Sequence, residues 1–85
     1  MRLHPEGLAI RVRTDVKGQP LAFTHAGQTH QVDGIEDVRE PRLDWWSPLG
    51  EAHRVYYLLT TRRGMICEIF EDKVGGGWFL ARVYD

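Results

Sequence analysis

The chain has 85 residues, of which 42% are hydrophobic and 27% are charged, and its formal net charge is -1. This composition excludes a disordered chain, and the length predicts one domain over residues 1–85 with a modest core. No apolar run approaches the roughly 18 residues of a membrane-spanning helix, and no signal-peptide pattern begins the chain, so we expect a cytoplasmic protein without membrane association. The single cysteine, Cys67, excludes an internal disulfide.

The first predicted element is a strand over residues 8–14, because apolar and polar side chains alternate there with a period of two. One face carries Leu8, Ile10, Val12 and Thr14, and the other carries Arg11 and Arg13. Residues 15–20 then have turn chemistry, with a glycine and a proline.

A β-hairpin follows, with its second strand beginning at Thr29. We place Gly27 and Gln28 at the two central positions of its turn. This register puts His25 opposite His30, and Phe23, His25, His30 and Val32 on one side. The second strand of the hairpin is expected to continue through a bulge or bend at Gly34.

The longest connection runs from residue 40 to residue 52 and contains two prolines and the adjacent Trp45 and Trp46. Neighbours in an extended segment point in opposite directions, so burying both rings is difficult. One ring is then left as a platform that stacks bases, or both close the ends of a barrel. The acids around this loop disfavour a phosphate backbone over it.

Three more strands are predicted at residues 53–61, 64–71 and 77–84, and short turns join them. Six strands without a long helical period predict an all-β fold, namely a small antiparallel barrel or bent sheet of SH3-like size, with the long tryptophan loop between strands three and four. Cys67 reads as a small buried hydrophobic residue. We interpret Glu68 as a charged residue on the solvent side of an edge strand. We interpret Glu71 and Asp72 as capping residues at a turn.

Charge is unevenly distributed along the chain. Residues 1–32 carry four basic and two acidic residues, whereas residues 33–51 carry two basic and six acidic ones. Nine of the eleven basic residues are arginines, which suit planar contacts with phosphates and bases. The alternative is that these arginines are solvated surface residues.

His25 and His30 are weak candidates for a metal site, because imidazoles from opposed strands can reach one ion. A third ligand is not visible nearby, so packed or solvent-edge histidines are the alternative. No residue set forms a catalytic signature, and no cofactor is predicted.

Several segments carry a family resemblance that covers nearly the whole chain. They are Pro20-Leu21-Ala22-Phe23 with Gly27 and Val32, Asp44-Trp45-Trp46, Arg54-Val55-Tyr56-Tyr57 and the terminal Gly77-Trp78-Phe79-Leu80-Ala81-Arg82-Val83-Tyr84-Asp85. The chain resembles a family of small bacterial domains of unknown function. Similar segments occur at the C-terminus of the inactive, Y-family polymerase-like protein of the bacterial mutasome. Where the family has large aromatics at two opposed hairpin positions, this sequence has His25 and His30.

The resemblance implies a setting in bacterial DNA repair or damage tolerance, and we expect a non-enzymatic interaction module that binds a partner protein or single- or double-stranded DNA. The candidate binding residues are Arg11, Arg13, Trp45, Trp46, Arg62, Arg63 and Arg82. The alternative is a self-associating structural or protein-interaction domain with no nucleic-acid role. In that case Trp78 and Tyr84 on the last strand pair edge to edge with another chain.

Overall fold

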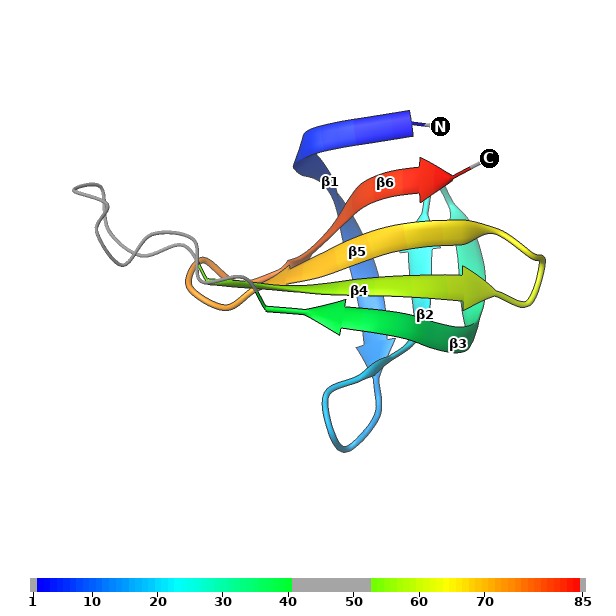
Figure 1. The fold of residues 1–85 in the computed structure, drawn as a ribbon, viewed down its shortest axis with the longest axis horizontal. Helices are drawn as coiled ribbons and strands as arrows, with labels where there is room; N and C mark the ends of the chain where they lie inside the picture. The colour runs from blue at the N-terminus through cyan, green and yellow to red at the C-terminus, as the bar shows by residue number, and fades with distance from the viewer. Residues whose placement is uncertain (1, 41–52, 85) are drawn as a thin grey trace.

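The computed structural model describes residues 2–40 and 53–84, with their side chains from residue 7 onward. These residues form six antiparallel strands that close into a barrel in chain order, as the last strand pairs with the first (Figure 1). The strands are β1 (Arg2–Thr14), β2 (Pro20–His25), β3 (Gln28–Arg39), β4 (Arg54–Thr61), β5 (Ile66–Asp72) and β6 (Trp78–Tyr84). The predicted all-β class and small antiparallel barrel are confirmed. Trp45, Trp46 and their loop lie outside the described residues.

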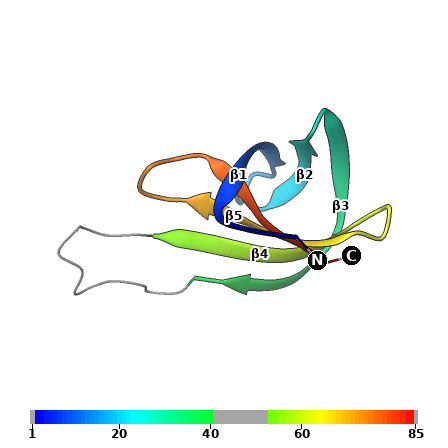
Figure 2. The ribbon, with the colours of Figure 1, turned by 90° about the horizontal axis from the view of Figure 1, so that it is seen from above.

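The first strand begins earlier than the predicted start at Leu8 and bends sharply near its start (Figures 1 and 2). Its pairing with β6 shifts register between Leu3 and Leu8. Gly7 has a φ of 81°, and a Cβ at this position would lie 2.7 Å from Cβ of Phe79 and 3.0 Å from the ring of Phe70. Both the backbone conformation and the lack of space therefore require glycine at the bend.

The β2–β3 hairpin differs from the predicted register. Ala26 and Gly27, with φ angles of 52° and 76°, form the turn, so His25 pairs with Gln28 and Phe23 pairs with His30. The prediction of a Gly27–Gln28 turn with His25 opposite His30 is wrong. The reason is that a tight turn with two positive φ angles favours glycine at its second central position, which Gly27 occupies.

A bulged β3 carries the sheet from β2 to β4. Its first residues pair with β2 as far as Gln31, and the pairing with β4 begins at Val32. The register with β4 shifts between Val32 and Gly34, which confirms the predicted bulge at Gly34, and again between Ile35 and Asp37. Such bulges bend a strand and increase its twist, which helps a small sheet to close.

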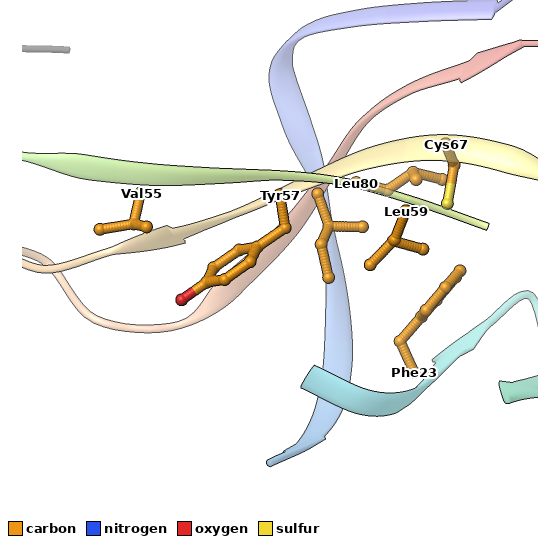
Figure 3. Packing of buried hydrophobic residues seen from close by; sticks show 7 residues of the cluster. Phe23, Val55, Tyr57, Leu59, Cys67 and Leu80 are labelled. Carbon is orange, nitrogen blue, oxygen red and sulfur yellow. The ribbon is translucent and has the colours of Figure 1, made fainter. Parts of the chain in front are cut away.

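The barrel interior is filled by alternating side chains of the central strands (Figure 3). Burial along β4 switches at every residue, as expected for one face toward the core. Cys67 is fully buried, which confirms its prediction as a small buried hydrophobic residue. The core cluster consists of Phe23, Val55, Tyr57, Leu59, Cys67, Ile69 and Leu80.

Two predictions about strand edges are wrong because the barrel closes. Glu68 was expected on the solvent side of an edge strand, yet β5 lies between β4 and β6, and Glu68 is only 6% exposed. The alternative of a self-associating domain assumed that the last strand offers an edge to another chain through Trp78 and Tyr84. Instead β6 pairs with β1 on one side and with β5 on the other, so this edge is already occupied.

Capping at the β5–β6 turn is confirmed for Asp72. Its Oδ1 accepts hydrogen bonds from the backbone N–H groups of Val74 and Gly75, at 3.0 and 2.9 Å. These bonds, with that of Gly75 contributing most, lower the pKa of the Asp72 carboxyl group. Glu71 instead pairs with Lys73 at 2.9 Å.

Candidate functional site

Arg11 and Arg13 lie on the outer face of the sheet formed by β1, β2 and β3, and both are exposed. The intervening Val12 points inward and packs against the core cluster, which fixes both arginines on the outside. In register, Arg11 lies opposite Thr24, and Thr24 lies opposite Thr29. The strand geometry thus aligns an arginine and two threonines across three strands.

A shallow hollow of about 310 Å³ lies on this face. We call it the outer groove, and it is lined by Arg11, Val12, Arg13, Ala22, Thr24 and Thr29. Ala22 pairs with Arg13 on one side and Gln31 on the other, and its methyl group leaves space between these longer side chains. Among the residues whose side chains the structure describes, no acidic and no aromatic one lines the groove.

Two hydroxyl groups lie together on the floor of the outer groove. The Oγ1 atoms of Thr24 and Thr29 are 3.2 Å apart, so one hydroxyl donates a hydrogen bond to the other. Sequence reasoning missed these residues because the predicted hairpin register was shifted. The predicted register put both threonines on one face but opposite other residues, whereas a turn with Gly27 at its second position makes them direct cross-strand partners.

Arg62 and Arg63 lie on the turn between β4 and β5, at the end of the barrel where β3 starts (Figures 1 and 2). The backbone N–H of Arg62 donates to the carbonyl oxygen of Gln31 at 3.0 Å, which attaches this turn to β3. Gln31 is the register partner of Ala22 on the groove floor. The structure therefore attaches this turn to β3, and the charge of Arg63 acts on His30, which lies on the face opposite to the groove.

The charges of these four arginines are not neutralised within the described part of the chain. Among residues 7–40 and 53–84 the ion pairs are Arg39–Glu68, His53–Glu40 and Lys73–Glu71, and none includes a groove or turn arginine. Asp15, the acid nearest to Arg13 in sequence, accepts hydrogen bonds from the backbone N–H groups of Lys17 and Gln19. Its carboxylate thus stabilises the β1–β2 turn.

Arg82 is separated from the outer groove. It lies on β6 as the register partner of Glu68, and its Nη1 donates to the hydroxyl oxygen of Tyr84 at 3.0 Å. Its guanidinium also lies 5.6 Å from the centroid of the Tyr84 ring. The structure does not bring this predicted site residue together with Arg11 and Arg13.

Arg82 belongs instead to a second surface feature, which we call the arginine–aromatic face. Arg54 lies 4.6 Å from the ring centroid of Phe70, and Arg39 lies 5.6 Å from that of Tyr56. These contacts hold the guanidinium groups against aromatic rings. The face comprises Arg39, Arg54, Tyr56, Arg82 and Tyr84, and the buried ring of Phe70 lies beneath Arg54.

His25 and His30 share one face of the hairpin but are diagonal to each other. The His30 ring stacks on Phe23 with a centroid distance of 5.0 Å. Burial lowers the pKa of His30, and the Arg63 guanidinium and His25 lower it further. The described residues contain no group of three or more His, Cys, Asp or Glu side chains that could hold a metal ion, so they supply no third ligand to this pair.

Comparisons with known proteins found no relative of this chain. No family model matches it, and neither a curated protein nor a solved structure was found to be similar. No helix long and apolar enough to cross a membrane was found among the described residues. The fold and the groove together define a small closed β-barrel with a basic, hydroxyl-lined outer surface.

Proposed function

We propose that this protein is a non-enzymatic module that binds the phosphate backbone of nucleic acid across the outer groove. The observation that carries the proposal is the pair Arg11 and Arg13, exposed on one face over a hollow with a threonine floor. Neither arginine has an ion-pair partner among residues 7–40 and 53–84. An arginine held in this way offers its N–H fork to an external anion.

The spacing of the two arginines suits a repeating anion. Residues two apart on a strand are separated by about 6.6 Å along its axis, comparable with successive phosphates of a nucleic-acid strand. The turn that carries Arg62 and Arg63 is attached to β3 through Gln31 and adds positive charge near this sheet. Phosphate contacts of this kind supply affinity without reading sequence.

The setting that we propose is bacterial DNA repair or damage tolerance, with DNA as the nucleic acid. It rests on the resemblance of the sequence to the C-terminal segment of the mutasome protein.

The second candidate function is binding of a partner protein or a second copy through the arginine–aromatic face. Tyrosine and arginine are the residues that most often dominate the energy of protein interfaces. Here Tyr56 and Tyr84 are partly exposed beside three arginines. A molecular mass that rises with protein concentration and falls back in a Tyr84→Ala variant would favour this function.

The test of nucleic-acid binding is a titration of labelled single- and double-stranded oligonucleotides, followed by fluorescence anisotropy at several salt concentrations. Arg13→Gln should weaken binding several-fold and reduce the slope of log K against log salt by about 0.7 to 0.9, the loss of one phosphate contact. Lys73→Gln is the matched control, because it removes one positive charge at the far end of β5. If the two variants weaken binding equally, binding depends only on the net charge of the protein. The outer groove would then not be the binding site.

A further inference from the structure

We infer that the outer groove contains a seat for one phosphate group, formed by the Thr24–Thr29 hydroxyl pair and the guanidinium group of Arg11, which stand in one row across the sheet. This inference rests on the proposed function and deepens it. It assigns a role to neutral side chains on the groove floor, which a purely electrostatic surface would not need.

The donor count of the floor supports such a seat. Each threonine hydroxyl has one proton to donate, and the 3.2 Å separation of the two Oγ1 atoms uses one of these protons between them. The hydroxyl that accepts this bond keeps its own proton for a bound group. Thr29 is exposed and Thr24 partly so, and therefore a ligand can reach the pair.

The two rows of residues across the sheet give the seat its shape. One row contains Arg11, Thr24 and Thr29, and the next contains Arg13, Ala22 and Gln31. Because the side chain of Ala22 is only a methyl group, the surface is depressed at the middle of the second row, between Arg13 and Gln31. The N–H donors of Arg11 and the free hydroxyl stand in the first row beside this low point and can meet around one anion, while Arg13 contacts the neighbouring phosphate.

The chemistry of the lining selects phosphate oxygens over bases. Among residues 7–40 and 53–84 no aromatic side chain lines the groove, so these residues offer bases no stacking surface there. None of them lines it with an acidic side chain either, so an anion meets no like charge from them. Phosphate oxygens accept hydrogen bonds from charged guanidinium N–H groups and from a neutral hydroxyl group.

A phosphodiester inside a strand and a terminal or free phosphate share this chemistry. Oligonucleotides with and without a 5′-phosphate, together with inorganic phosphate as a competitor, distinguish the two sources. Equal affinity of both oligonucleotides identifies the internal diester, and a preference for the phosphorylated end identifies the terminal group. Either result supports a phosphate seat.

The decisive variant is the double change Thr24→Val and Thr29→Val, which keeps the β-branched shape and removes both hydroxyl groups. It should weaken oligonucleotide binding about 3- to 10-fold, as expected for the net contribution of one hydrogen bond at an exposed site. Because no charge is removed, the salt slope should stay at the wild-type value. Thr60→Val on the outer face of β4 is the matched control and should bind like the wild type.

Thr29→Ser keeps a hydroxyl and should retain most of the affinity, which separates the hydrogen bond from side-chain packing. If the wild type binds oligonucleotides and the double valine variant binds equally well, the phosphate seat is wrong while the proposed function stands. If the wild type binds none, the proposed function fails. In that case perturbation of the Thr24 and Thr29 amide signals by inorganic phosphate still supports the seat, and unchanged signals overturn it.

Discussion

The guanidinium of Arg39 on β3 reaches across β4 to the carboxylate of Glu68 on β5, with Nη2 and Oε2 2.5 Å apart. Glu68 is almost fully buried, whereas the side chain of Arg39 is 57% exposed. The hydrogen bond and the charge of Glu68 raise the pKa of Arg39. A buried carboxylate needs such a partner, so this contact fixes the end of β3 against the sheet.

Arg39→Gln is therefore expected to lower the free energy of unfolding by about 1–2 kcal/mol, a range reduced for the exposure of the arginine. Urea unfolding of Arg39→Gln, Glu68→Gln and the double variant measures the coupling between the two side chains. Arg62→Gln is the control, because it changes an exposed arginine at a turn and should shift stability by less than about 0.5 kcal/mol. A coupling energy of zero would contradict the importance of the ion pair.

Gly7→Ala is expected to destabilise the protein by about 1–3 kcal/mol, since it adds backbone strain and a contact with Phe79 and Phe70. Gly18 separates these two causes. Its φ of 84° is nearly the same, but a Cβ there would meet nothing within 4 Å. Thermal unfolding should show a larger loss for Gly7→Ala than for Gly18→Ala, and equal losses would contradict the close approach of β1 to the two rings.

His30 should make the protein less stable as the pH falls below 6.5. Burial, Arg63 and His25 lower its folded pKa from the ordinary value of 6.5. The unfolded chain therefore takes up the proton first, and its free energy falls relative to the folded state. We expect unfolding free energies to decline as the pH falls below the ordinary value of 6.5 and His30→Gln to flatten this decline. If the unfolding free energy of His30→Gln depends on pH as steeply as that of the wild type, another group causes the decline.

The thiol of Cys67 should be unreactive in the folded protein. Burial raises its pKa to about 12, and none of the residue is exposed to solvent. Since the thiolate is the reactive form, an aromatic disulfide reagent at mildly alkaline pH should modify Cys67 only after unfolding in urea. Modification of the native protein at the rate of a free thiol would contradict the closed barrel core.

The alternation of side chains was enough to predict most of the fold. The alternation around Val12 predicted the exposed arginine pair on β1, and a chain without long helical periods predicted a small barrel. The position of Glu68 could not be predicted in this way. Whether a strand lies at an edge depends on barrel closure through β1 and β6, which distant residues decide.

The candidate site was predicted in part. Arg11, Arg13, Arg62 and Arg63 were named from their positions on strands and turns, and the structure places the first two on the groove and attaches the turn of the other two to β3. Arg82 was named for its charge alone, and the register directs it toward Tyr84 instead. The Thr24–Thr29 floor was missed because a small error in hairpin register changes which residues face each other.

The central claim is that the protein binds a phosphate backbone through the arginines of the outer groove. The most direct measurement is the affinity of the wild type and of the double variant Arg11→Gln, Arg13→Gln for one labelled oligonucleotide, from low to moderate salt. We predict wild-type binding that weakens steeply as salt rises, and a double variant that binds weakly with a slope smaller by about 1.4 to 1.8, the loss of two phosphate contacts. Wild-type binding that is absent at low salt, or a double variant with the same slope, would contradict the claim.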